Sequence, residues 1–173
     1  QWSGGMLQRA VIAMAMAGDP QLLLADEPTT ALDVTIQDQI LALLLELQDR
    51  KNMAMLLVSH DMAIVAETCD QVAVMYAGQI VEVATVQKLF AAPMHPYTVG
   101  LINSIPKLTG QSRRLVPIAG QPPNLVNIRG GCPFAERCQY VSPDCVEIPV
   151  SLRDIEVDHQ TACIYPERIE RLQ

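Results

Sequence analysis

The chain has 173 residues, half of them hydrophobic, and a formal net charge of −7 at pH 7. This length accommodates one domain, or one domain with a small appendage. The negative charge argues against nucleic acid as a general partner, because contacts with phosphate backbones need a basic surface. No charge-free apolar stretch reaches the roughly 20 residues that cross a bilayer, so the sequence predicts no transmembrane helix.

Helical and strand patterns alternate in the first part of the chain. We expect a helix from Ser3, whose hydroxyl can cap it, to about Ala17, and a buried strand over residues 22–25, covered on both faces. A second helix over 35–50 and a second buried strand over 54–58 follow from apolar spacing. This order is typical of an α/β domain with a mostly parallel sheet and flanking helices.

The next part of the chain contains a hairpin signal. Ala77-Gly78 separates two strand-like segments, and short helices are expected before and after this hairpin. The expected elements are a helix to Cys69, strands over 71–76 and 79–84, a helix from Thr85 to Phe90 and a helix over 97–104. Prolines recur and periodicity ends near Pro106. We therefore predict two domains, 1–105 and 106–173, the second irregular and held together only by its cysteines.

Two carboxylates follow the first predicted strand. Asp26 and Glu27 would lie at its carboxyl end, where open α/β sheets bind their ligands. A metal-binding carboxylate beside a base suits phosphoryl transfer, which depends mainly on positioning and on neutralising charge. A solvated helix cap would explain the pair alone, but the apolar run before it and Pro28-Thr29-Thr30 after it favour a site.

Two further features are suited to binding phosphate. Ser3-Gly4-Gly5 opens a helix, so its backbone N–H groups and helix dipole favour an anion. His60 follows the second predicted strand, and a neutral imidazole there can hydrogen-bond a phosphate and an attacking water. A histidine after a strand is more often a surface residue, and Asp33 can be read as a simple helix cap.

Four of the five cysteines lie in the last third of the chain. The spacing C-x5-C-x6-C-x17-C provides four thiolates, enough for zinc or for a cubane iron–sulfur cluster, although free thiols remain an alternative. Neither paired C-x2-C knuckles nor ferredoxin spacing is present. Cys69, on an apolar helix, fits a core position better. The four cysteines are Cys132, Cys138, Cys145 and Cys163.

These motifs together resemble the ABC-type ATPases, which have a P-loop NTPase-like fold. The resemblance covers essentially the whole chain, and its four matches are the signature motif, the Walker B strand, the D-loop and the switch histidine. Two further stretches, Met75 to Glu82 and His95-Pro96-Tyr97-Thr98, recur in peptide-importer ATPases. The four motifs are, in that order, Ser3-Gly4-Gly5, Asp26-Glu27, Ala31-Leu32-Asp33 and Val58-Ser59-His60-Asp61.

The resemblance implies roles for these residues with ATP and Mg²⁺. Asp26 would hold Mg²⁺, Glu27 would activate the attacking water and His60 would contact the γ-phosphate. The signature would reach the nucleotide of a partner subunit, and Trp2 replaces the leucine usual before it. The cysteines resemble a C-terminal extension that in some peptide importers carries a [4Fe-4S] cluster, which we favour over zinc. The residues expected near ATP or the partner subunit are Ser3, Gly4, Gly5, Asp26 and Asp33.

The chain contains no Gly-x-x-x-x-Gly-Lys-Ser/Thr phosphate loop, and it does not begin with methionine. We therefore expect a C-terminal fragment that is inactive by itself. The leading prediction for the intact protein is the ATPase subunit of a dipeptide or oligopeptide (or nickel) importer. It would lie peripherally on the cytoplasmic face of the bacterial inner membrane.

The expected partners are a second, homologous ATPase subunit, forming a heterodimer, two transmembrane permeases and, indirectly, an extracytoplasmic peptide-binding protein. A soluble ABC ATPase of translation or DNA repair is one alternative, although the sequence has neither a second ATPase half nor a heptad run. A small iron–sulfur or zinc redox protein is another, and it would leave Asp26, Glu27 and His60 unexplained.

Overall fold

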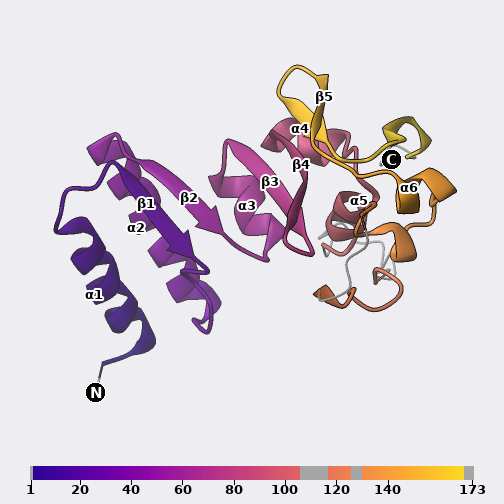
Figure 1. Ribbon diagram of the computed structural model, residues 1–173. Helices are drawn as coiled ribbons and strands as arrows, with labels where there is room; N and C mark the ends of the chain where they lie inside the picture. Colours follow the sequence, from indigo (N-terminus) through magenta and orange to yellow (C-terminus); the bar gives the residue numbers. More distant parts are fainter. Residues whose placement is uncertain (1, 106–116, 126–129, 170–173) are drawn as a thin grey trace. The chain divides into compact units, whose positions relative to one another are not determined.

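The computed structural model describes residues 2–105, 117–125 and 130–169 (Figure 1). The chain forms two compact units, 1–68 and 69–173. The boundary predicted near Pro106 lies outside the described residues. None of the helices in the described ranges is long and apolar enough to cross a membrane.

Unit 1 has the expected order of helices and strands. Ser3 caps the first helix with its hydroxyl, and Asp33 caps the second with its carboxylate. Asn52 adopts the left-handed conformation that ends the second helix. The two strands pair in parallel, from Leu22↔Ala54 to Asp26↔Val58. The elements are α1 (Gly4–Met16), β1 (Leu22–Asp26), α2 (Val34–Lys51), β2 (Ala54–Val58) and α3 (Met62–Thr68).

The core of unit 1 lies on one face of this strand pair. It combines apolar side chains from α1, β1 and α2 with Met53. The other face is apolar but exposed, because its four large side chains keep 49–67% of their surface accessible. Coverage on both faces, as predicted for the strand at 22–25, is therefore not found in the described residues. The exposed side chains are Leu22, Leu24, Leu56 and Val58.

Unit 2 is built on an antiparallel sheet in the order β3-β4-β6-β5. The hairpin turn was predicted, and Ala77 and Gly78 both have positive φ there, 50° and 78°. A two-residue connection permits only antiparallel pairing, so β3 and β4 are antiparallel. Within the described ranges, the parallel pairing predicted from the sequence is found in β1 and β2 alone. The strands are β3 (Gln71–Tyr76), β4 (Gln79–Thr85), β5 (Arg153–Glu156) and β6 (His159–Thr161).

The helices of unit 2 are short. His95 caps the second of them, with Pro96 in its first turn. Both helices that follow the hairpin, α4 and α5, agree with the sequence prediction, whereas α6 was not predicted. The helical elements are α4 (Val86–Ala91), α5 (Pro96–Asn103), α6 (Pro143–Glu147) and two 3-10 turns, Ala135–Arg137 and Pro166–Arg168.

The last part of the chain is held by more than its cysteines, so that prediction was wrong. Strand β6 pairs with β4, with Thr161 opposite Glu82. Phe134 packs edge-on against Tyr76, their ring centroids 5.2 Å apart. Arg137 donates to the Tyr76 hydroxyl and to backbone carbonyls of the 117–125 segment. Strand pairing and an aromatic cluster therefore anchor the segment that follows residue 130.

A buried hydrogen bond between two titratable side chains lies where β4 meets β6. His159 Nε2 is 2.7 Å from Glu82 Oε1, and the two side chains are 1% and 0% exposed. The same carboxylate oxygen accepts the backbone N–H of Met94 at 2.6 Å. The pair therefore links the sheet to the segment that leads into α5.

Candidate functional site

The predicted catalytic residues of unit 1 meet at one edge of the parallel strands. Glu27 follows β1 and His60 follows β2, and because these strands are parallel neighbours their carboxyl ends coincide. His60 Nδ1 lies 3.1 Å from Glu27 Oε1, and the Thr30 hydroxyl donates to Glu27 Oε2 at 2.7 Å. Both carboxylate oxygens of Glu27 are therefore engaged by neighbouring side chains.

These contacts affect the charge of Glu27. The Thr30 hydroxyl, and then His60, hold the pKa of the Glu27 carboxyl below its ordinary value, so the group is ionised at neutral pH. An ionised carboxylate only accepts hydrogen bonds, so His60 Nδ1 must carry the proton that it donates. A neutral His60 ring then offers a lone pair at Nε2. The His60 side chain is 76% exposed, which leaves this nitrogen accessible.

The other predicted residues of unit 1 occupy the expected positions. Asp26 ends β1, opposite Val58, and its side chain is exposed. Asp33 Oδ1 accepts the backbone N–H of Ile36 at 3.0 Å, so its interpretation as a helix cap is confirmed. Its role at a subunit contact stays a prediction.

The glycine pair has a packing role that the sequence did not indicate. A Cβ on Gly4 would lie 3.2 Å from Leu32 Cδ2, and a Cβ on Gly5 would lie 2.8 Å from Ile36 Cγ2. Glycine therefore lets the start of α1 approach the start of α2 closely. Among the described residues, no hydrogen bond or ion pair joins this turn to Glu27 or His60.

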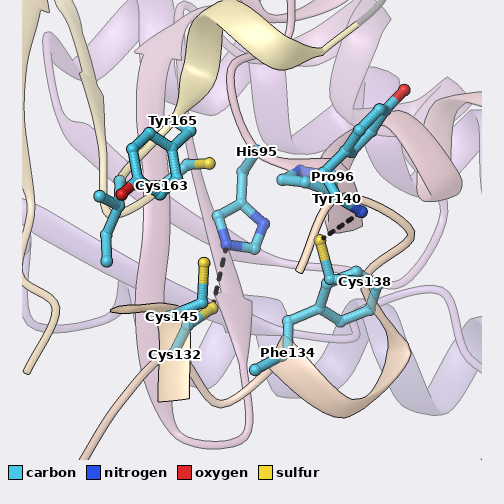
Figure 2. A pocket seen from close by; sticks show the side chains of 11 residues that line it. His95, Pro96, Cys132, Phe134, Cys138, Tyr140, Cys145, Cys163 and Tyr165 are labelled. Atoms are coloured by element: carbon cyan, nitrogen blue, oxygen red, sulfur yellow. Dashed lines mark hydrogen bonds between the residues drawn. The ribbon is translucent and has the colours of Figure 1, made fainter. Parts of the chain in front are cut away.

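The four clustered cysteines line a single pocket in unit 2, together with His95 (Figure 2). Cys132 and Cys138 flank the 3-10 turn at 135–137, Cys145 lies on α6, and Cys163 follows β6. The Cys132 N–H donates to the carbonyl of Cys145 at 2.7 Å, which joins two of these segments. The fold therefore gathers thiols from segments as far apart as residues 132 and 163.

Polar groups lie near three of the four sulfur atoms. The Tyr140 N–H lies 3.4 Å from Cys138 Sγ, and the Ser142 hydroxyl lies 3.4 Å from Cys145 Sγ. His95 Nε2 lies 3.9 Å from Cys132 Sγ. Hydrogen bonds of this kind stabilise thiolates and tune iron–sulfur centres.

Burial favours the protonated form of three of the four thiols. It raises the pKa of Cys132 and of Cys138, and neighbouring cysteines raise both further. Burial, with a smaller contribution from the other three thiols, raises the pKa of Cys163 to about 12. A bound cation would have to displace these protons, because only the thiolate is a metal ligand.

The arrangement differs from a site for a single metal ion. In the described ranges, no three His, Cys, Asp or Glu side chains are close enough together to hold one ion. Zinc requires all its ligands at about 2.0–2.3 Å from one centre. A cubane cluster places each thiolate on a different iron atom, so its ligands are farther apart. The identity of a bound metal therefore stays a prediction.

Gly131 fixes the spacing at this pocket, and its substitution gives a sharp test. A Cβ at Gly131 would lie 2.4 Å from the Val146 carbonyl oxygen and 2.5 Å from that of Cys145. Because both are backbone atoms, Gly131→Ala should lower the free energy of unfolding by roughly 1–3 kcal/mol, measured by urea denaturation.

Gly130→Ala is the matched control for this experiment. No atom lies within 4 Å of a Cβ at Gly130, so this neighbouring variant should be neutral or slightly stabilising. Equal stability of the two variants would contradict the close packing described for Gly131.

Comparisons with known proteins place the chain in a family. Residues 81–145 match the family model "Oligopeptide/dipeptide transporter, C-terminal region", and residues 1–30 match "ABC transporter". The chain is 51% identical over 149 residues to the oligopeptide transport ATP-binding protein OppD of Haemophilus influenzae, covering 86% of this chain and 46% of that protein. The chain belongs to the oligopeptide/dipeptide ABC transporter ATP-binding proteins.

Other members of this family align along nearly the whole chain. A probable peptide ABC transporter ATP-binding protein, y4tR of Sinorhizobium fredii, is 53% identical over 94% of this chain and 49% of its own. The dipeptide transport ATP-binding protein DppD of Escherichia coli is 47% identical over 96% of this chain and 51% of its own. The chain therefore spans about half the length of these relatives.

Solved structures match as well. One of them is a dimer of the ATP-binding cassette MJ0796 with ADP and Pi, 31% identical, with a TM-score of 0.45 over 50% of this chain and 37% of that chain.

Two residues of this family member were not assigned to a site from the sequence. Thr30 lies three residues after Glu27, at a spacing that allows its hydroxyl to reach back across the turn. His95 was interpreted only as part of a helix start, which is confirmed, yet its ring also lies in the cysteine pocket. Burial lowers the pKa of His95 to about 4, so the ring is neutral at pH 7. Only the three-dimensional fold brings His95 to Cys132, 37 residues later.

Proposed function

We propose that the protein containing this chain hydrolyses ATP and thereby powers import of dipeptides or oligopeptides, with nickel as an alternative cargo. The observation that carries the proposal is the contact between Glu27 and His60 at the carboxyl edge of two parallel strands. Membership of the family and the identities of its relatives support peptides as the cargo.

The residues of this edge have distinct tasks in the proposed reaction. Asp26, exposed at the end of β1, would hold Mg²⁺ through water, and the ion would neutralise charge on the phosphates of bound ATP. Glu27 would polarise the attacking water, with Thr30 and His60 fixing the direction of its carboxylate. In this geometry neutral His60 can accept a hydrogen from that water at Nε2. To donate to a phosphate, the ring must leave Glu27 or take up a proton.

We propose that a second, homologous ATPase subunit completes the site. The start of α1, with Ser3, Gly4 and Gly5, would face the nucleotide of this partner, and Asp33 would line the contact. The exposed apolar face of β1 and β2 supports further packing against other parts of a longer protein, since parallel sheets are covered on both faces.

The remaining partners are proposed from the family. Two permease subunits would span the inner membrane, the ATPase would lie on their cytoplasmic side, and a peptide-binding protein would act outside. The net charge of −7 argues against nucleic acid as a partner.

We also propose that Cys132, Cys138, Cys145 and Cys163 hold a [4Fe-4S] cluster. Their shared pocket and the polar groups that lie 3.4–3.9 Å from three of the sulfur atoms support this assignment. Zinc is less well supported because no three ligands converge on one centre in the described part of the chain. When bound, the cluster would cross-link the segments that carry the four thiolates, in addition to the strand pairing and aromatic contacts that hold them.

The function is tested with the complete protein and its two permeases in proteoliposomes. We expect ATP-dependent uptake of peptide and ATP hydrolysis that rises when peptide and binding protein are present. Co-purification with ribosomes, or failure to associate with any membrane protein, would overturn the transport proposal in favour of the soluble ABC ATPase alternative.

The cluster is tested by Cys145→Ser. We expect this variant to lose most of its bound iron and its visible absorption band, because one of four ligands is removed. Cys69→Ser is the matched control, since Cys69 does not line the pocket. Iron and zinc are both measured per chain, and full metal retention by Cys145→Ser would contradict the assignment.

A further inference from the structure

Among the described residues that line the cysteine pocket, His95 alone has a side-chain nitrogen, and its surroundings determine where its proton lies. The ring is almost fully buried, with 1% of its surface exposed. Its Nδ1 accepts the backbone N–H of Tyr97 at 3.2 Å, as the cap of α5. An N–H group points at this nitrogen, so Nδ1 must present a lone pair. In a neutral imidazole the proton is then on Nε2.

The protonated nitrogen faces sulfur. Nε2 lies 3.9 Å from Cys132 Sγ, and Figure 2 shows the ring among the cysteine side chains. For His95 to ligate a metal through Nε2, the proton would have to move to Nδ1, where it would point at the N–H of Tyr97. The helix cap therefore makes His95 unsuitable as a ligand and suitable as an N–H donor.

The backbone around His95 is held in place by the buried network of unit 2. The Met94 N–H donates to Glu82, and the Met94 carbonyl accepts from the Thr161 hydroxyl at 3.1 Å. The same Thr161 hydroxyl oxygen accepts the N–H of Cys163 at 3.1 Å. Thr161 thus ties the position of His95 to that of one of the four cysteines.

We infer that His95 is a positioning residue that donates an Nε2–H···S hydrogen bond to Cys132 and thereby tunes the metal group held by the four cysteines. The inference rests on the proposed [4Fe-4S] cluster. A hydrogen bond to a ligating sulfur stabilises added negative charge, so it favours the reduced state of the cluster. Removing the donor should therefore lower the midpoint reduction potential.

Two substitutions distinguish the role of His95 as a hydrogen-bond donor to Cys132 from its role as the cap of α5. His95→Asn places an amide oxygen where Nδ1 lies, so it keeps the cap, but its side chain is too short to reach Cys132. His95→Gln can place an N–H near the position of Nε2 while disturbing the cap. If His95 acts as a donor, the Asn variant changes the potential and the Gln variant does not. A purely structural role predicts the reverse order.

The experiment measures iron content and midpoint potential in the complete protein. We expect His95→Asn to make reduction about tenfold less favourable, a shift of about 59 mV for one electron. We expect His95→Gln to stay close to the unchanged protein. Equal potentials in all three proteins, each with full iron, would overturn the inference while leaving the cluster intact.

Pulsed EPR on the unchanged protein with ¹⁵N-labelled histidine provides a test that does not depend on whether a variant folds. A weak nitrogen coupling to the reduced cluster is expected for a hydrogen-bond donor. Strong coupling would show direct ligation and overturn the donor role. Absence of iron from the unchanged protein would overturn the cluster itself, and with it this inference.

Discussion

Replacing Glu27 by glutamine in the complete protein is expected to lower the rate of ATP hydrolysis by roughly 10²–10⁴-fold, the usual contribution of a general base. Glutamine has the size of glutamate and retains an oxygen that can accept from Thr30 or His60. It lacks the negative charge that polarises water. Binding of ATP should persist while its cleavage fails, so the variant should retain uncleaved nucleotide after gel filtration.

Glu46→Gln is the matched control for this experiment. Glu46 lies on α2 in the same unit, and its carboxylate forms an exposed ion pair with Arg50 at 3.0 Å. Such surface pairs contribute little to stability, so this variant should hydrolyse ATP normally. Normal hydrolysis by Glu27→Gln would refute Glu27 as the base, whichever cargo the transporter carries.

The helices and strands of unit 1 were predictable because their signals are local. Ser3 and Asp33 cap α1 and α2, and apolar runs define β1 and β2 within a residue of their observed ends. The same local order brought Glu27 and His60 to one edge, since parallel neighbours share their carboxyl ends. Thr30 was missed because a hydroxyl in a turn has many possible partners.

The arrangement of unit 2 depends on contacts between distant residues. Strand β6 has only three residues and pairs with β4 about 77 positions earlier, so no periodic pattern reveals it. Glu82 and His159 are polar residues, yet they are fully buried. The hairpin of β3 and β4 was predictable, whereas the two further strands of the sheet and the place of His95 could be recognised only in the folded chain.

The buried pair predicts the largest effect on stability. His159→Leu is expected to lower the free energy of unfolding of unit 2 by roughly 3–5 kcal/mol, because it leaves the Glu82 carboxylate buried without its partner. Only the N–H of Met94 would remain to compensate the charge. Urea denaturation measures the change, and faster hydrogen exchange of the β4 and β6 amides would locate it in this unit.

A second substitution shows whether the unpaired charge causes this loss. In the double variant Glu82→Gln with His159→Leu, the side chain left in the core is neutral and can still accept from Met94. Part of the lost stability should return, so the two substitutions should be strongly non-additive. If His159→Leu instead costs less than about 1 kcal/mol, as surface changes do, then the pair does not anchor β6 on β4. In that case the aromatic cluster around Phe134 would be the main attachment of the cysteine segment.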